Sequence, residues 1–202
     1  TVIRASSNRS NIFYMVRKID CQNGSLLNQA AVHAKEAWMD SGFFDHACDK
    51  IILYVRTCKD ADDLAELLNC SSYTAESGTP VEKKQILDRW TQAPDMPYIV
   101  ATTALAEGFD YPYVRLVINV DEPESLVIFA QESGRAGRDG KRAYSVVLLP
   151  KTWQPQVIEA PLADPQKVHN HRDDLTLRKR RDKQAAHQYL EGKQCYRTSL
   201  SD

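Results

Sequence analysis

Hydrophobic residues along the chain fall into two alternating patterns, and the first is a set of short, continuous apolar runs. The clearest is residues 51–55 (IILYV), and such a run is typical of a strand buried on both faces of a sheet. A more polar segment near residues 72–75 is also predicted to be a strand. The predicted strands therefore cover residues 51–55, 72–75, 98–101, 114–120 and 144–149.

The second pattern is the helical spacing between these runs. Apolar residues recur three and four positions apart from Leu27 to Trp38, which indicates one buried helix face. A further helix has a start signal of its own, because Thr79 can cap it, Pro80 suits its first turn and Glu82 can close a capping box. The remaining helices are predicted over residues 61–68, 125–132 and 172–192.

Strands that alternate with helices predict an α/β fold, in this case a mostly parallel sheet flanked by helices. In such sheets ligands bind beyond the C-terminal ends of the strands. Those ends lead into Thr102 and Thr103 and, one helix later, into the loop after Glu132. The chemistry of the protein is therefore expected in these two places.

Composition and charge restrict the class of protein further. The chain has 202 residues, 26 Lys and Arg, 27 Asp and Glu, and a net charge of −1. This balance argues against a histone-like polycation, although a local basic patch could still bind nucleic acid. No apolar run approaches the roughly 20 residues of a membrane span. The start of the chain shows no targeting signal and no initiator Met, so we expect a fragment of a longer protein.

Residues 131–140 (QESGRAGRDG) are the most informative segment for chemistry. Arg135 and Arg138 stand three residues apart, which puts both guanidinium groups on one side of a helical turn. The glycines would let backbone amides approach an anion, and the planar guanidinium group fits phosphate oxygens. The segment therefore predicts a polyphosphate site. The alternative is a surface turn whose arginines pair with Glu132 and Asp139.

A second segment, residues 101–110 (ATTALAEGFD), follows a predicted strand. The hydroxyl groups of Thr102 and Thr103 could hold a phosphate, and the carboxylate of Asp110 could accept a hydrogen bond from a ribose hydroxyl. Alone, this pattern is equally typical of a strand-to-loop cap without a binding role.

Taken together, the two segments resemble motifs V and VI of superfamily-2 helicases, and within that group the RecQ family of DNA helicases. The match runs through residues 99–123 (IVATTALAEGFDYPYVRLVINVDEP) into QESGRAGRDG. Residues 8–12 (NRSNI) resemble the segment that leads into that family's second motor domain, and residues 73–75 (YTA) resemble its YHAG. The resemblance covers residues 8–150 and is most like a telomere-linked subgroup of RecQ-like helicases.

The resemblance implies the second RecA-like motor domain of an ATP-dependent, 3′-to-5′ DNA helicase. Arg138 is then the arginine finger that reaches the γ-phosphate of ATP, with Arg135 beside it. Gln131, Gly108 and Asp110 are implied to face the nucleotide. ATP and Mg²⁺ would be held mainly by a first RecA-like domain of the same protein. Because these 202 residues contain no G-x-x-x-x-G-K-[ST] loop, the fragment alone is expected to be inactive.

The resemblance also implies a grip on DNA, at single-strand and duplex junctions, by a nuclear protein. Thr102 and Thr103 are the implied contacts to the phosphates of the translocating strand. Arg56 is a further candidate, although it stands one residue away from the arginine of the family pattern. At a strand end, such a shift can reverse the direction of the side chain.

Beyond the motor, the family carries a zinc module, and Tyr189, Cys195 and Leu200 match the start of it. Cys195 is thus an implied Zn²⁺ ligand of the longer protein, and a free thiol is the alternative. The basic run at residues 178–181 is either a solvated helix face or a phosphate-binding patch. The expected organisation is a RecA-like domain at residues 1–150, a proline-rich linker at 151–171 and the helical start of a zinc subdomain at 172–202.

Two other functions stay open at this point. The chain could belong to a helicase-derived nucleic-acid-binding module without ATPase activity. It could also belong to another superfamily-2 ATPase that acts on RNA or DNA.

Overall fold

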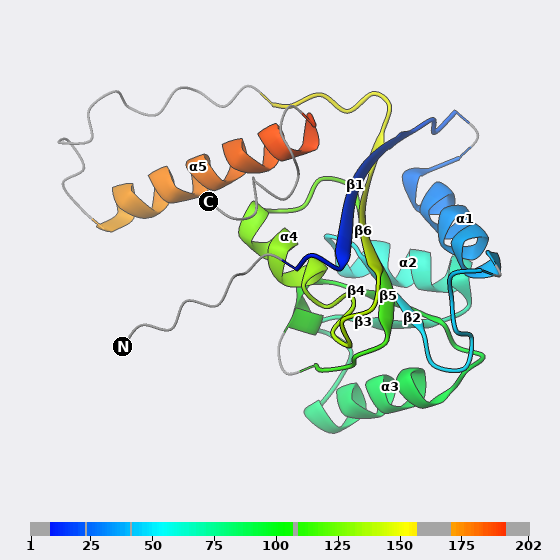
Figure 1. The fold of residues 1–202 in the computed structure, drawn as a ribbon. Coiled ribbons are helices and arrows are strands. Elements are labelled where there is room, and N and C mark those ends of the chain that lie inside the picture. Colours follow the sequence, from blue (N-terminus) through cyan, green and yellow to red (C-terminus); the bar gives the residue numbers. More distant parts are fainter. Residues whose placement is uncertain (1–8, 23, 41, 107–108, 157–170, 193–202) are drawn as a thin grey trace.

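A parallel sheet with helices on both faces organises the chain (Figure 1), as seen in a computed structural model that describes residues 9–22, 24–40, 42–106, 109–156 and 171–192. In the described residues the strand order is β1-β6-β5-β2-β4-β3, and every neighbouring pair is parallel. The predicted α/β class is therefore confirmed. The strands are β1 (Ile12–Ile19), β2 (Lys50–Tyr54), β3 (Ser71–Tyr73), β4 (Tyr98–Ala101), β5 (Val114–Val120) and β6 (Ala143–Pro150).

Strand β2 explains why the sheet is covered on both faces. Ile51 and Leu53 join one core cluster, whereas Ile52 and Tyr54 join another on the opposite face. Side chains that alternate in direction along a strand produce this division. The first cluster includes residues of α1 and α2, and the second includes residues of α3. The helices are α1 (Leu26–Met39), α2 (Cys58–Leu68), α3 (Pro80–Gln92), α4 (Leu126–Ser133) and α5 (His171–Leu190), with a 3₁₀ turn η1 (Thr103–Ala106).

The edge strand β1 is absent from the strands predicted above. Its residues are mostly half-buried or exposed, and Phe13, Arg17 and Lys18 are among the exposed ones. In the structure β1 pairs in parallel register with β6 along its whole length, from Ile12 opposite Ala143 onward. Residues 12–16 (IFYMV) nevertheless form a continuous apolar run like that of β2, so the sequence does carry a signal for this strand.

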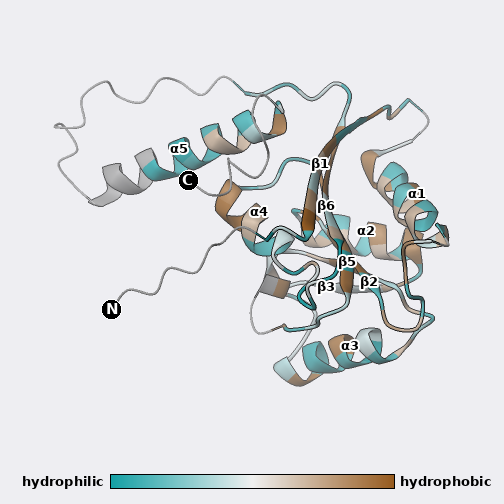
Figure 2. Ribbon diagram, in the orientation of Figure 1, coloured by the Kyte–Doolittle hydropathy of each residue, from teal (hydrophilic) through white to brown (hydrophobic). Residues whose placement is uncertain are grey.

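Helix α5 docks on the sheet domain through its C-terminal end. Tyr189 packs on Phe129 of α4 with ring centroids 4.9 Å apart, and both side chains belong to one buried cluster. In Figure 2 the coloured part of α5 is mostly hydrophilic, and its C-terminal end carries the apolar residues that contact the sheet domain. Glu122 strengthens the contact, since its carboxylate lies 2.8 Å from His187 Nε2 and accepts a hydrogen bond from Trp153. None of the helices that the structure describes is long and apolar enough to cross a membrane.

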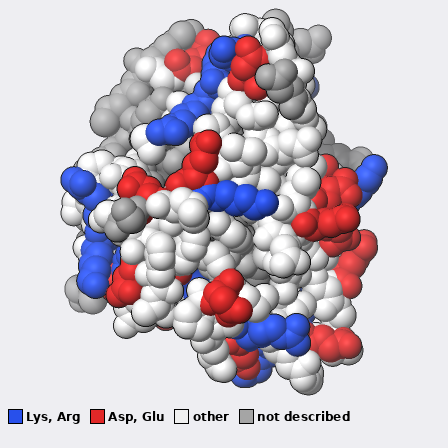
Figure 3. All heavy atoms as spheres, turned by 90° about the vertical axis from the view of Figure 1, so that its right-hand side faces the viewer, with Lys and Arg blue, Asp and Glu red and all other residues white. Residues whose placement is uncertain are grey.

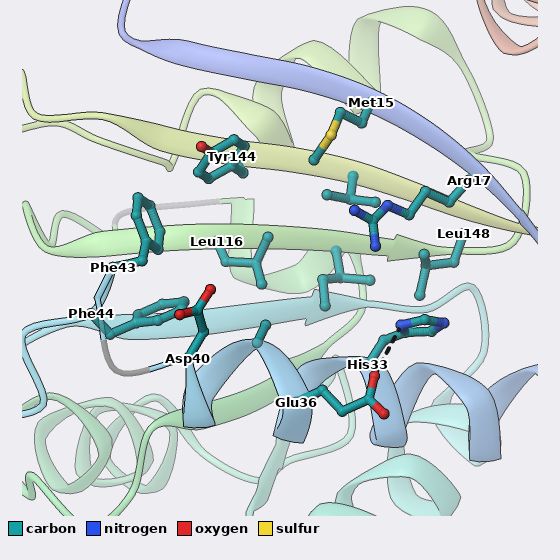
Figure 4. Close-up of a pocket in the computed structure, with 13 residues that line it drawn as sticks. Met15, Arg17, His33, Glu36, Asp40, Phe43, Phe44, Leu116, Tyr144 and Leu148 are labelled. Carbon is teal, nitrogen blue, oxygen red and sulfur yellow. Dashed lines mark ion pairs between the residues drawn. The ribbon is translucent and has the colours of Figure 1, made fainter.

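Helix α1 leaves a groove of about 530 Å³ between itself and the sheet. Met15, Leu116 and Leu148 lie along its floor, and Arg17 and Asp40 point toward it from opposite walls (Figure 4). The space-filling view from the right-hand side of Figure 1 shows acidic and basic side chains interspersed with uncharged surface (Figure 3). The groove contains none of the residues that the sequence singles out for chemistry, so the candidate site lies elsewhere.

We expect the cap of α3 to contribute measurably to stability. Thr79 accepts a hydrogen bond from the amide of Glu82, and Glu82 accepts one from the amide of Thr79 at 2.7 Å. Thr79→Ala should lower the free energy of unfolding by about 1 kcal/mol, measured by urea denaturation. Thr79→Ser keeps the hydroxyl and serves as the control. Equal stability of the two variants would contradict a role for the cap.

Candidate nucleotide and nucleic-acid site

The two segments that the sequence singles out meet at the backbone carbonyl of Phe109. Arg135 Nη1 donates a short hydrogen bond to this oxygen, and Arg138 Nη1 lies 3.4 Å from it. Both guanidinium groups therefore lie on the same side of the loop, as their spacing predicts. Arg138 also forms an ion pair with Asp110, with 2.5 Å between Nη1 and Oδ1.

The ion pair between Arg138 and Asp110 is exposed to solvent. The Asp110 side chain keeps 79% of its accessible surface and that of Arg138 keeps 30%. Exposed ion pairs contribute little to stability, typically about 0–1 kcal/mol. Arg138 can consequently exchange Asp110 for another anion at little energetic cost.

The loop at residues 134–140, called the arginine loop below, uses its backbone amides internally. The amide of Arg135 donates to Glu132, that of Gly137 to Val114 at 2.8 Å, and that of Gly140 to Gly137. The prediction that the glycines open backbone amides to an anion is therefore wrong for these positions. Anion binding at this loop is left to the two guanidinium groups.

A buried cation fastens the arginine loop to the sheet. Arg115 of β5 is 3% exposed, and its guanidinium group bonds both carboxylate oxygens of Asp139. Its Nε also lies 2.9 Å from Oδ1 of Asp49. These hydrogen bonds from Arg115 lower the pKa of Asp139, whereas burial outweighs Arg115 at Asp49 and raises the pKa there. Because Asp139 pairs with Arg115, it does not pair with Arg135 or Arg138 as the surface-turn alternative requires.

Glu132, the other carboxylate of that alternative, is bonded elsewhere. It is 4% exposed and accepts a hydrogen bond from Nδ2 of Asn119 at 2.5 Å. Burial is the main reason that its pKa is raised to about 7; the Asn119 hydrogen bond acts against this shift, and Glu124 adds to it. The hydroxyl group of Tyr54 is also buried, with no hydrogen-bond partner within the described part of the chain. Glu132 thus holds α4 to β5 rather than pairing with the arginines.

Four predicted site residues lie along one groove of about 870 Å³, together with a lysine that was not predicted. The groove is lined in part by Lys83 of α3, which the sequence reasoning missed. Lys83 Nζ donates to the carbonyl of Ala75 at 2.9 Å and lies over the ring of Tyr73. Only its place three residues after Pro80, on the first turns of a helix at the C-terminal edge of the sheet, could have pointed to it. The four predicted residues in the groove are Thr102, Thr103, Gln131 and Arg135.

Arg56 lies in a separate, smaller pocket of about 290 Å³. This pocket also contains Thr103, so it adjoins the groove, but it is otherwise rich in carboxylates such as Asp121 and Glu124. The structure therefore does not bring Arg56 into the groove with Gln131 and Arg135. Acidic neighbours make the pocket a poor place for a phosphate.

Two predicted site residues, Gly108 and Cys195, lie outside the described residues. The proposed start of the zinc subdomain at residues 193–202 and most of the predicted linker lie outside them as well. Within the described ranges, no group of three or more His, Cys, Asp or Glu side chains is arranged to hold a metal ion.

Comparison with known proteins identifies the family and the fold. Residues 34–140 match the helicase conserved C-terminal domain, and these residues form more than half of the chain. The chain therefore belongs to the helicase conserved C-terminal domain family. The RecA-like architecture agrees with a solved structure, Mss116p DEAD-box helicase domain 2 bound to an RNA duplex, which matches with a TM-score of 0.57 at 21% identity over 70% of this chain and 55% of that one.

Relatives among curated proteins refine the family to the RecQ type. The putative ATP-dependent DNA helicase Q1 of Caenorhabditis elegans is 31% identical over 71% of this chain. The RecQ-like DNA helicase BLM of Xenopus laevis is 32% identical over 50% of it. A DEAD-box ATP-dependent RNA helicase 9 of Oryza sativa subsp. japonica is 31% identical over 57% of it. The resemblance to the C-terminal motor domain of RecQ-like helicases is thus confirmed, although the chain spans only 22%, 8% and 19% of the lengths of these relatives.

The raised pKa of Glu132 predicts a pH dependence of stability. The folded-state pKa of about 7 lies above the ordinary value of 4.5, so the folded protein binds this proton more tightly than the unfolded chain. Stability from this group is present below pH 4.5 and is lost as the pH rises to 7, by roughly 3 kcal/mol.

Glu132→Gln removes this titration and keeps an acceptor for Asn119. The variant should be more stable than wild type at pH 8 and nearly equal to it at pH 5, measured by urea unfolding. Glu66→Gln on the exposed face of α2 is the control. A stability difference that is the same at both pH values would contradict the assignment.

Proposed function

We propose that this chain is the second motor domain of an ATP-dependent, 3′-to-5′ RecQ-like DNA helicase, and that Arg138 is its arginine finger. The supporting observation is the arrangement of two arginines on one side of a fastened loop. Arg135 donates a short hydrogen bond to the Phe109 carbonyl, whereas Arg138 reaches that carbonyl only at 3.4 Å and pairs with the exposed carboxylate of Asp110. Arg135 is thereby suited to hold the loop, and Arg138 is suited to exchange Asp110 for another anion.

In this proposal Arg138 reaches the γ-phosphate of ATP when the first RecA-like domain closes on this one. Its guanidinium group stabilises the negative charge that develops on the transferring phosphoryl group. Arginine fingers in other nucleotide hydrolases contribute about 10³–10⁵ in rate. Gln131 and Gly108 keep the nucleotide-binding role that the resemblance implies, and Asp110 returns as the partner of Arg138 when the cleft opens. ATP and Mg²⁺ are held mainly by the first domain.

The groove beside the arginine loop is the proposed grip on single-stranded DNA. The hydroxyl groups of Thr102 and Thr103 and the ammonium group of Lys83 face it, and all of them can bond phosphate oxygens. Contacts to the backbone carry no sequence information, which suits a motor that steps along any sequence. Arg56 is not part of this proposed grip, because it lies in the adjoining pocket among carboxylates.

For the longer protein, we propose the organisation that the resemblance implies. Residues 1–150 form the RecA-like domain, residues 151–171 the linker, and residues 172–202 the start of a zinc subdomain with Cys195 as a ligand. The docking of α5 on α4 supports a fixed placement of that subdomain against the motor. A nuclear location and a preference for junctions of single-stranded and duplex DNA belong to the same proposal.

An RNA-dependent ATPase is the second candidate function, and the match to a plant DEAD-box RNA helicase favours it. Phosphate contacts in the groove do not distinguish the two nucleic acids, because the discriminating group is the 2′-hydroxyl. ATPase activity of the full-length protein, measured with equal lengths of single-stranded DNA and RNA, decides between them. Stimulation by RNA alone would replace the DNA helicase proposal.

The arginine-finger assignment predicts a large loss of hydrolysis. Arg138→Ala in the full-length protein should lower the kcat of DNA-stimulated ATP hydrolysis by 10³-fold or more while ATP binding is retained. Arg89→Ala on the exposed surface of α3 is the matched control and should leave kcat unchanged. A full-length enzyme that hydrolyses ATP and is indifferent to Arg138→Ala would place the nucleotide elsewhere. A folded protein that binds DNA but has no ATPase activity would instead favour a binding module.

The DNA grip predicts a uniform loss of affinity. Lys83→Gln should weaken binding of single strands of any sequence by the same factor and reduce the slope of log K against log salt by about 0.7. Lys84→Gln is the control, because the neighbouring Lys84 pairs with Asp88 on the same helix and does not line the groove. Fluorescence anisotropy at several salt concentrations gives both quantities. Equal effects of the two substitutions would remove Lys83 from the grip.

A further inference from the structure

The segment at residues 9–11, called the entering segment below, bonds directly to the arginine loop more than 120 residues away in sequence. Asn11 Nδ2 donates to the carbonyl of Gly137 at 2.8 Å and to that of Lys141 at 2.8 Å. Arg9 Nη2 donates to the same Gly137 carbonyl at 2.6 Å and to that of Ala136 at 3.1 Å. These two side chains thus bond three carbonyl groups, those of Ala136 and Gly137 in the arginine loop and that of Lys141 directly after it.

Gly137, directly before Arg138, is the residue where these contacts converge. Its carbonyl accepts from Asn11 and Arg9, and its amide donates to Val114 at 2.8 Å. Its φ is +56°, and a Cβ at this position would lie 2.5 Å from Asn11 Nδ2 and 2.8 Å from the carbonyl of Lys141. Only glycine allows the entering segment to approach the loop this closely.

We propose that Asn11, supported by Arg9, is a positioning residue that sets the arginine loop in register for Arg138. The inference rests on the proposed function of Arg138 and deepens it. Asn11 touches no reacting group. It acts by fixing the backbone one residue before Arg138, and a displacement of about 1 Å in such a group can lower a rate about 10²-fold.

The position of Asn11 in the chain adds a consequence for coupling. Its carbonyl accepts from the amide of Ala143 at 2.9 Å, where β1 and β6 begin to pair. Asn11 is therefore fixed to the sheet and to the arginine loop at once. Under the proposed function, in which a first motor domain precedes this segment, a movement of that domain would reach a residue bonded to the arginine loop.

Asn11 differs from Arg115, which also fastens the loop. Arg115 is buried with two carboxylates, so its removal would leave uncompensated charges in the core. Asn11 is half-buried and neutral, and its substitution leaves no buried charge. The role of Asn11 can therefore be tested without dismantling the fold.

A double-mutant cycle in the full-length protein tests the proposal. Asn11→Ala should lower the kcat of DNA-stimulated ATP hydrolysis 10- to 100-fold, with little change in the KM for ATP. In the Arg138→Ala background, the same substitution should change the single-turnover rate less than 2-fold, because the group that Asn11 positions is gone. Asn28→Ala on the exposed face of α1 is the matched control and should leave all rates unchanged.

Each other outcome overturns a distinct statement. Equal losses from Asn11→Ala in both backgrounds, or no loss in either, would show that Asn11 does not act through Arg138. Full activity of Arg138→Ala would instead remove the proposed function, whatever Asn11 does. Melting temperatures verify folding, and if Asn11→Ala does not fold, Arg9→Met replaces it, with the same non-additive result expected and additivity again contradicting the proposal.

Discussion

The buried guanidinium group of Arg115 is the constraint on which the candidate site depends. It joins Asp139 at the end of the arginine loop to Asp49 at the start of β2, in a place where none of the three charges is well solvated. Removing one member of a buried ion network costs about 3–5 kcal/mol, because its partners lose their compensation. The loop is consequently held to the sheet at one end by a strong interaction, and Gly137 is held by hydrogen bonds from Asn11 and Arg9. The side chain of Arg138, by contrast, is held by a weak, exposed ion pair with Asp110 and a long hydrogen bond to Phe109.

The contacts of the loop thus weaken from Asp139 to Arg138, and this order suits the proposed motor function. A rigid backbone keeps the guanidinium group of Arg138 close to where it is needed, so little reorganisation is required during the reaction. The exposed pair with Asp110 lets the side chain move on each cycle. In the proposed function helix α4 connects the two tasks, since its Gln131 lines the groove while the loop that follows it carries Arg135 and Arg138. The proposal therefore couples the nucleotide side to the nucleic-acid side through one short helix, which the hydrogen bond from Asn119 to Glu132 holds to β5.

Much of this organisation could be predicted from local sequence patterns, and the remainder depends on contacts between distant residues. Apolar runs give β2, β4 and β5, and the spacing of Arg135 and Arg138 correctly places both on one side. Strand β1 is missed although residues 12–16 (IFYMV) form an apolar run as continuous as that of β2. Lys83, Arg115 and Asn11 are missed as site residues because their roles come from partners 24 to 130 residues away or from a groove that exists only after folding. The amide cradle is wrongly predicted because glycine spacing does not reveal that the loop amides are already bonded within the domain.

The most direct test of the account is a structure of the full-length protein with ADP, aluminium fluoride and single-stranded DNA. We expect the backbone of the arginine loop to stay in place, with Asp139 on Arg115, while the Arg138 side chain leaves Asp110 and bonds the fluoride ligands. The measured quantity is the distance from the Arg138 guanidinium nitrogens to the fluoride atoms, expected within about 3.2 Å. An Arg138 that stays on Asp110, with another residue of this domain on the fluoride, would contradict the account.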